Sequence, residues 1–197
     1  MRAISAALGS VLVAGLALTG CSSTDEQTPQ AQSDSAITID NCGTEVTVQG
    51  PVQRATTLEQ GATDTLLLLG AKDQIAGYGH QKDLPPAGFS LDGLKEVSPS
   101  VPNSEQLRDA DTDFIFSPFD ENWRADAAGT REEWAKLGVA TFNPNSECPS
   151  YGDNKGKDSF QLIAKDLEDL GKLFGREEEA KKLIEKQTSE LENAKQA

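Results

Sequence analysis

The sequence contains few basic residues, three cysteines and one histidine. Its 197 residues carry 18 Lys and Arg against 32 Asp and Glu, which gives a formal net charge of −14. Binding of nucleic acid requires clustered Lys and Arg, so this balance argues against a nucleic-acid partner. His80 stands alone and no Cys-x-x-Cys pair occurs, so we expect no metal site built from protein ligands. No Gly-x-Ser-x-Gly element accompanies His80, and no third glycine follows Gly77 and Gly79 to open a helix, so neither catalysis nor a nucleotide cofactor is indicated.

One long apolar run is present, at the N-terminus. Residues 1–20 join Arg2 to an apolar stretch that is too short and too poorly flanked for a stable membrane span, as in a signal peptide. The run ends in the tetrapeptide LTGC, which resembles the bacterial lipobox, and its cysteine, Cys21, would be diacylated. This predicts a lipid-anchored protein on the outer, extracytoplasmic face of the cell membrane. A plain secretory signal with an incidental cysteine is the alternative.

Two further cysteines remain, Cys42 and Cys148. In an exported chain, a pair of cysteines indicates one disulfide bond. A pair of free thiols is the alternative interpretation.

A polar segment separates the predicted signal peptide from the first regular pattern. Residues 21–36 show no apolar period and predict a disordered tether. Apolar and polar residues then alternate over 37–40 and 45–48, on either side of a turn that contains Asn41 and Gly43. This pattern predicts a β-hairpin.

A strand, a helix and a second strand follow in close succession. Residues 55–58 predict a buried strand, residues 63–69 a helix, and residues 74–78 another strand. Such a unit forms parallel strands with a right-handed crossover, and ligands meet parallel sheets at the carboxyl ends of the strands. We therefore expect residues 59–61 and 78–80 to share one edge of a sheet, which would be a binding face.

The remaining patterns extend this unit to an α/β fold. Residues 84–100, 119–129 and 143–156 predict loops. Further strands are predicted at 113–118 and 139–142. A short helix is predicted to open at 102–105, and further helices are predicted at 130–137, at 158–175 and from 176 to the last residue. The predicted fold is a Rossmann-like open sheet with parallel central strands flanked by helices, preceded by a β-hairpin and ending in a long helix.

Four segments in this order carry a resemblance to a known family. They are the hairpin turn Asn41-Cys42-Gly43, the unit that runs from Arg54 to Gly77, the segment from Pro102 to Ile115, and the helix pair that runs from Leu170 to Ile184. Behind a lipobox, they resemble the lipoprotein solute-binding components of ABC importers for ferric siderophores, haem and cobalamin.

The resemblance implies a domain organisation. Members of the family have two α/β lobes joined by one helix, and the ligand is held between the lobes. Residues 37–156 would form the first lobe, residues 157–175 the joining helix and residues 176–197 the start of a second lobe. Such a chain would be either a fragment of a two-lobed protein or a single-lobe molecule.

The resemblance also implies a function and a partner. A monomeric, membrane-anchored protein would capture a ferric siderophore or a similar metal chelate, such as haem or cobalamin, and deliver it to an ABC permease. Glu105 matches the position at which the family's first lobe meets arginines of the permease, although an ordinary helix-surface acid is the alternative. A single-lobe, membrane-tethered module that docks on an envelope partner without its own ligand is the alternative function, and an envelope enzyme on the same scaffold is a third.

Candidate ligand-binding residues lie near the carboxyl ends of the predicted strands. Backbone amides at a helix start suit acceptor oxygens, and exposed aromatic rings suit a planar or apolar ligand. For each position the alternative is a solvated loop or packing within the loop. The candidates are Glu59, Gln60, Gly61, Tyr78, His80, Ser117, Phe119, Trp123 and Asn145.

Overall fold

The computed structural model describes residues 35–196. The predicted signal peptide, Cys21 and most of the predicted tether lie outside the described residues. An antiparallel pair, β1 (Ala36–Asn41) and β2 (Thr44–Gln49), opens the described part and confirms the predicted hairpin. Within residues 35–196, no helix has the length and apolar character needed to cross a lipid bilayer.

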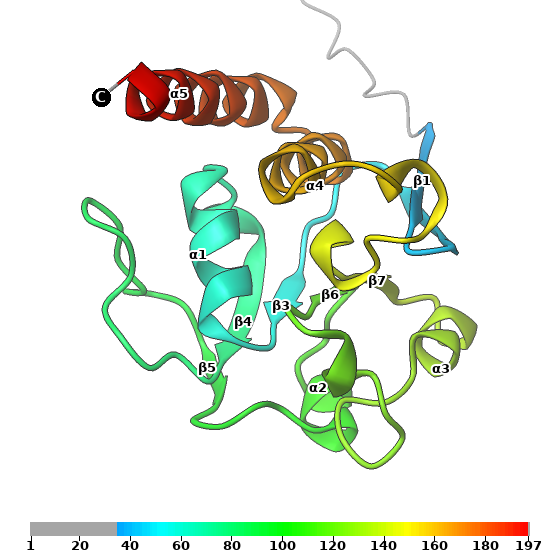
Figure 1. Ribbon diagram of the computed structural model, residues 1–197. Coiled ribbons are helices and arrows are strands. Elements are labelled where there is room, and N and C mark those ends of the chain that lie inside the picture. The colour runs from blue at the N-terminus through cyan, green and yellow to red at the C-terminus, as the bar shows by residue number, and fades with distance from the viewer. Residues whose placement is uncertain (1–34, 197) are drawn as a thin grey trace, which may run out of the picture. The chain divides into compact units, whose positions relative to one another are not determined.

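Five strands form a parallel sheet in the order β5-β4-β3-β6-β7 (Figure 1). They are β3 (Ala55–Thr57), β4 (Ile75–Gly79), β5 (Glu96–Ser98), β6 (Phe114–Phe116) and β7 (Ala140–Phe142). The central strand β3 pairs with β4 on one side and with β6 on the other. The predicted α/β fold with an open parallel sheet is confirmed.

Helices connect the strands and complete the chain. They are α1 (Gln60–Leu68), α2 (Ser104–Asp109), α3 (Arg131–Lys136), α4 (Ser159–Phe174) and α5 (Glu177–Gln196). Short 3-10 helices occur at η1 (Lys72–Gln74), η2 (Asp120–Asn122), η3 (Asn145–Glu147) and η4 (Gly152–Asn154). Capping boxes at Asn103, Thr130 and Asp158 fix the starts of α2, α3 and α4.

Two elements differ from the sequence-based expectation. Helix α1 begins at Gln60 and not at residue 63. Glu59 precedes the helix with an extended backbone and no side-chain cap, so the usual capping signal in the sequence is missing at this start. Strand β5 lies inside the predicted loop at 84–100. It is an edge strand of three residues with Val97 as its only apolar side chain, so it produces almost no periodic signal.

The side chains of the strands alternate between two apolar clusters. Phe114 and Phe116 join the cluster that α1 and α4 complete, and the ring of Phe174 stands edge-on at 5.3 Å from that of Phe114. Ile115 joins the second cluster, with Leu107 of α2 and Trp134 of α3. Because helices cover both faces of the sheet, polar loops can gather only at the ends of the strands.

Helix α5 packs against α4 through a close approach at Gly171. A Cβ atom at this position would lie 2.8 Å from the Cβ of Ala180, and both residues are buried. Although glycine lowers helix propensity, its missing side chain lets the two helices approach here.

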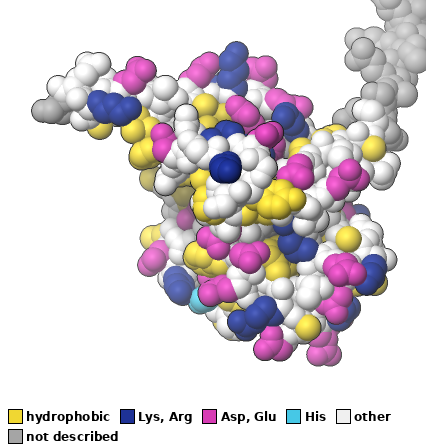
Figure 2. All heavy atoms as spheres, turned by 45° about the vertical axis from the view of Figure 1, so that its right-hand side comes forward, with side chains coloured by type: hydrophobic (Ala, Val, Ile, Leu, Met, Phe, Trp, Pro, Cys, Tyr) yellow, Lys and Arg dark blue, Asp and Glu magenta, His cyan; other side chains and the backbone are white. Residues whose placement is uncertain are grey.

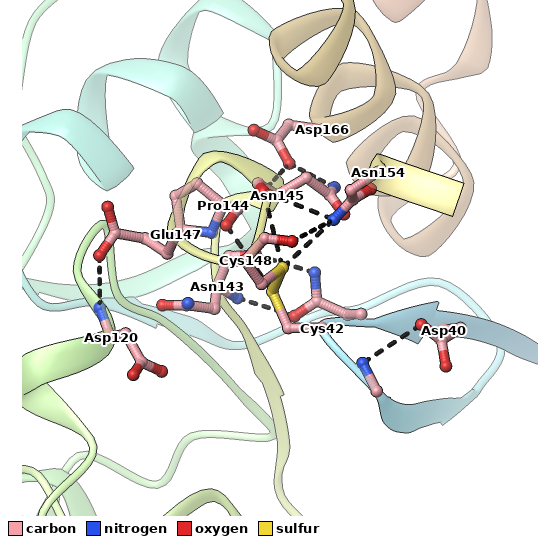
Figure 3. Close-up of a disulfide and its surroundings, with 12 residues drawn as sticks. Asp40, Cys42, Asp120, Asn143, Pro144, Asn145, Glu147, Cys148, Asn154 and Asp166 are labelled. Carbon is pink, nitrogen blue, oxygen red and sulfur yellow. Dashed lines mark hydrogen bonds between the residues drawn. A yellow bond between two sulfur atoms is a disulfide. The ribbon is translucent and has the colours of Figure 1, made fainter. Parts of the chain in front are cut away.

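A disulfide bond joins Cys42 in the hairpin turn to Cys148 in the loop after β7 (Figure 3). The two residues are 106 positions apart in the sequence, and their Cα atoms are 5.6 Å apart. The predicted disulfide is confirmed. It fixes the hairpin to the part of the chain that follows the last strand of the sheet.

A half-buried guanidinium reinforces the same junction. Arg131 donates to the backbone oxygen and the side-chain oxygen of Asn41 at 3.0 and 2.8 Å, and to both oxygens of Thr141 at 3.0 and 3.1 Å. Burial lowers the pKa of Arg131 to about 10, so its side chain remains charged at neutral pH. The first turn of α3 is thereby tied to the hairpin and to β7.

Candidate functional site

The carboxyl ends of the strands meet at one edge of the sheet, which we call the carboxyl edge. The register aligns Thr57 of β3 with Tyr78 of β4 on one side and with Phe116 of β6 on the other. The loops after these strands therefore emerge side by side. The edge is formed by residues 58–61, 80–83, 117–123 and 143–147, which follow β3, β4, β6 and β7.

Glu59 joins three of these loops. Its backbone caps α1 in an extended conformation, and its side chain is only 16% exposed. Asn122 donates its Nδ2 to Glu59 Oε1 at 2.9 Å and to Ser117 Oγ at 3.0 Å. His80 Nδ1 lies 3.5 Å from Glu59 Oε2, within the range of an ion pair when the imidazole is protonated. The predicted candidates Glu59, His80 and Ser117 are thus brought together, with Asn122 as the connecting residue.

His80 adopts a left-handed backbone conformation with a φ of 49°. This conformation is uncommon outside glycine and turns the chain sharply at the end of β4. The side chain is 26% exposed, and the single histidine of the sequence reaches the surface beside charged side chains (cyan in Figure 2). The imidazole of His80 is therefore accessible to a ligand at the carboxyl edge.

Gln60 and Gly61 form the first turn of α1. The amide side chain of Gln60 is engaged, because Nε2 donates to Asp64 at 3.2 Å and Oε1 accepts the Asp83 N–H at 3.1 Å. Gly61 is exposed and would carry a Cβ atom at an ordinary 3.6 Å from Pro118. The start of a helix favours acceptor oxygens through its backbone amides, so Gly61 offers main-chain rather than side-chain contacts.

Two aromatic candidates are accessible at the edge. Phe119 is 45% exposed in the loop after β6, which leaves part of its ring free for contact. Tyr78 is half-buried at the end of β4, and burial, followed by the nearby negative charge of Glu96, raises the pKa of its phenol. Tyr78 is therefore a neutral hydrogen-bonding group at physiological pH.

Three of the predicted candidates, Ser117, Trp123 and Asn145, are buried and form hydrogen bonds within the protein. Ser117 is fully buried, and its hydroxyl donates to the Phe119 carbonyl oxygen at 2.8 Å. Trp123 belongs to the second apolar cluster and donates Nε1 to Asn143 Oδ1 at 3.2 Å. For Trp123 the structure thus favours packing over a stacking surface. Asn145 is 1% exposed and donates from both its backbone and its side chain to Asp166.

A hollow of about 400 Å³ adjoins the edge at Gly61. Ligand pockets commonly fall between about 300 and 1,000 Å³, so this volume suits a small organic group. We call it the α1–α5 hollow, because residues of both α1 and α5 line it. It is lined by Gly61, Thr65, Leu68, Phe116, Pro118, Pro144, Ile163, Asp166, Leu167, Leu183 and Gln187.

A larger hollow of about 710 Å³ lies between the hairpin, the η4 loop and α4. Its wall mixes basic and acidic side chains, among which Lys165 and Asp169 already pair at 2.6 Å. Of the carboxyl-edge loops, only the one after β7 reaches it, through Asn145. We therefore centre the candidate site on the carboxyl edge and the α1–α5 hollow. Within residues 35–196, no group of three or more His, Cys, Asp or Glu side chains is arranged to hold a metal ion.

Two residues that organise this region, Asn122 and Asp166, were not predicted from the sequence. Asn122 lies in a 3-10 turn within a predicted loop, where the sequence carries no period that would orient its side chain. For Asp166 the helical spacing could have served as a signal, because it falls four positions after Leu162 on the buried face of α4. A carboxylate at a buried stripe position is unusual and indicates a specific partner.

Glu105 lies apart from the carboxyl-edge network, in the first turn of α2. Its side chain is exposed, and its backbone N–H is held by the cap residue Asn103 at 3.1 Å. Helix α2 follows β5, so its N-terminus lies on the same side of the sheet as the carboxyl ends of the strands. The structure places Glu105 where a protein partner can reach it.

No family model matches the chain, and no curated protein matches its sequence. Solved structures do match its fold. A periplasmic binding protein from Veillonella parvula has a TM-score of 0.64 and 21% identity, covering 78% of this chain and 51% of that one. An ABC-type Fe3+-hydroxamate transport system from Saccharomonospora viridis has a TM-score of 0.58 and 23% identity, with coverages of 76% and 52%.

A third match is the siderophore-binding protein BauB, solved with two molecules of acinetobactin and ferric iron. Its TM-score is 0.57 at 17% identity, covering 81% of this chain and 53% of that one. The chain spans about half the length of these three structures. Over that half, it has the α/β fold of the periplasmic binding proteins.

Proposed function

We propose that the chain is the ligand-capturing part of an extracytoplasmic substrate-binding protein for a metal chelate. The ligand would be a ferric siderophore or a similar chelate, such as haem or cobalamin. The protein would be anchored through acylated Cys21 and would deliver its ligand to an ABC permease. No chemical step is involved, because capture requires only complementary contacts that are released on delivery.

The observation that carries this proposal is the composition of the carboxyl edge. Polar groups converge there through Glu59, His80 and Asn122, beside the exposed ring of Phe119. A chelate brings its own metal ligands, so it needs hydrogen-bonding groups and apolar contact rather than protein ligands to the metal. The matched Saccharomonospora and BauB structures, whose titles name a Fe3+-hydroxamate system and a ferric siderophore complex, support this class of ligand.

The proposal is tested by titrating the purified protein separately with a ferric hydroxamate, haem and cobalamin. Binding of each ligand is measured by calorimetry and by the change in Trp123 fluorescence. We expect one of them to bind saturably. We expect Phe119→Ala to weaken that binding about three- to tenfold, the amount typical of a lost aromatic contact. Leu137→Ala is the matched control, because Leu137 is also exposed but precedes β7 at the opposite end of the strand. If none of the three ligands saturates the folded protein, chelate capture is refuted.

Glu105 is proposed to contact the permease. In cells that depend on this protein for uptake, Glu105→Arg should reduce uptake while ligand affinity stays unchanged, because the exposed carboxylate lies away from the carboxyl-edge network. Asp109→Arg makes the same charge change at an exposed position in the last turn of the same helix. Equal uptake by the wild type and Glu105→Arg would contradict this role.

The second candidate is a membrane-tethered module that docks on an envelope partner without a ligand of its own. The observation in its favour is the exposed carboxylate of Glu105 in the first turn of α2, which a protein partner can contact without any ligand. Stable association with the permease, together with no response to any of the three ligands, would favour this function.

A further inference from the structure

The α1–α5 hollow has an apolar wall with one charged residue. Among its lining residues only Asp166 carries a charge, and seven others are Leu, Ile, Phe or Pro. Leu68 and Ile163 are each 43% exposed, and both line this hollow, so their apolar surface is available to an occupant. Figure 2 shows patches of hydrophobic side chains among charged ones on the face in view.

The carboxylate of Asp166 is held in a fixed orientation. Its Oδ1 accepts the backbone N–H of Asn145 at 2.8 Å and the Asn145 side-chain amide at 2.6 Å. The second oxygen points away from Asn145 (Figure 3). Asn145 is not part of the hollow's lining whereas Asp166 is, so this second oxygen is the one available to an occupant of the hollow.

No basic side chain of the described residues forms an ion pair with this carboxylate. The nearest candidate along the helix, Lys165, is engaged by Asp169 at 2.6 Å. A carboxylate that is only 8% exposed and has no cationic partner is costly to keep ionised, unless a ligand supplies the missing charge.

We infer that the α1–α5 hollow binds an organic ammonium ion, whose N–H groups donate to the free oxygen of Asp166 while its hydrocarbon part packs on the apolar wall. The wall determines that the ligand carries an apolar body, and the carboxylate determines that its polar end is cationic. A volume of about 400 Å³ accommodates a primary amine with a short alkyl or aryl group. The inference stands on this hollow alone and does not require that the protein capture a chelate.

The test uses three probes of the same chain length: hexylammonium, hexanol and hexanoate. Calorimetry or NMR titration of the purified protein near pH 7.5 would give the three affinities. We expect hexylammonium to bind about tenfold or more tightly than hexanol, because a charge-assisted hydrogen bond forms in an apolar setting, and hexanoate to bind most weakly.

The variant Asp166→Asn retains an oxygen for Asn145 but removes the charge. It should abolish the preference for hexylammonium and leave the affinity for hexanol within about twofold, because the apolar wall is unchanged. Glu168→Gln is the matched control: it removes a charge from an exposed position on the same helix, outside the hollow, and should retain the preference.

Several outcomes would overturn the inference. Equal affinity of the wild type for hexylammonium and hexanol would mean that Asp166 plays no part in recognition. Absence of binding by all three probes would mean that the hollow is not a ligand site. A third outcome is that the protein dimerises with increasing concentration. If Leu183→Glu abolishes this dimerisation and hexylammonium does not affect it, the hollow is the contact surface for a second copy of the chain.

Discussion

At the scale of single residues, the role of Asp166 depends on a contact with a residue that is distant in the sequence. In the structure Asp166 lies on the buried face of α4, and its partner Asn145 is 21 positions away in a loop without periodicity. Asn145 was predicted as a ligand contact, whereas in the structure its backbone N–H and its side-chain amide both donate to Asp166. Neither the burial of Asp166 nor its pairing with Asn145 was predicted, because both depend on tertiary contacts.

The titration of Asp166 should be visible in the stability of the protein. Burial raises its pKa from the ordinary value of 3.8 to about 6, and the two hydrogen bonds from Asn145 offset only part of this effect. Between these values the folded state binds more protons than the unfolded state, so this residue makes the protein more stable as the pH falls from about 6 to about 4. The full penalty, roughly 3 kcal/mol, applies above pH 6.

Chemical unfolding of the wild type and of Asp166→Asn between pH 4 and pH 7.5 checks this prediction. The variant should be the more stable protein at pH 7.5 and should lose the gain on acidification, because its amide does not titrate. Glu168→Gln should follow the wild type. An Asp166→Asn variant that is no more stable at pH 7.5 would contradict the prediction.

At the scale of elements, the sequence predicted most helices and strands because their signals are local. The caps at Asn103, Thr130 and Asp158 can be read from neighbouring residues, whereas Phe160 and Ile163, which the helical period of α4 places on its apolar stripe, are exposed. Strand β5 was missed because its pairing with β4, and not its composition, makes it a strand. The candidate site was predicted in part: the loops that form it follow from strand order, but which side chains face outward depends on packing between loops.

The end of β4 should be intolerant of any side chain at Gly79. A methyl group there would collide with the ring of Pro102 and approach the Ser100 carbonyl oxygen at 3.3 Å. Because the proline ring is rigid, the segment that leads into α2 would have to move, and overpacking of this kind costs about 1–3 kcal/mol. We expect Gly79→Ala to lower the free energy of unfolding by this amount in urea denaturation.

Gly61→Ala is the matched control for this prediction. The new methyl group would meet Pro118 at an ordinary 3.6 Å within the first turn of α1, where alanine has the higher helix propensity. It should leave the stability unchanged or raise it by up to about 1 kcal/mol. Similar losses in both variants would mean that the close contact at Pro102 does not determine the packing.

At the scale of the whole described part, the disulfide is the longest covalent connection. It links positions 106 residues apart and holds the hairpin against the loop after β7. Closing a loop of this length stabilises a protein by up to about 4–5 kcal/mol in the chain-entropy account. The cysteine count predicted this bond, whereas the contacts of Arg131 and Asn41 around it needed the three-dimensional structure.

Removing the disulfide should lower stability without changing the fold. The double variant Cys42→Ser, Cys148→Ser should unfold in guanidinium chloride with a free energy lower by up to about 4–5 kcal/mol, while its circular dichroism spectrum is retained. The wild type measured with a reductant should match the variant, and the reductant should have no effect on the variant itself. A reductant-insensitive wild type would contradict the presence of the bond.

The side chain of Asn41 also bears on how the protein avoids association through β-sheet pairing. Strand β7 is an edge strand, and its outward backbone groups would offer a template to another chain. Asn41 donates to the carbonyl oxygen of Asn143 at 2.8 Å and accepts its N–H at 2.9 Å, as a neighbouring strand would. Arg131 takes the outward carbonyl oxygen of Thr141. One amide and one guanidinium thus occupy three of the outward backbone groups at this edge, with which a foreign strand would otherwise pair.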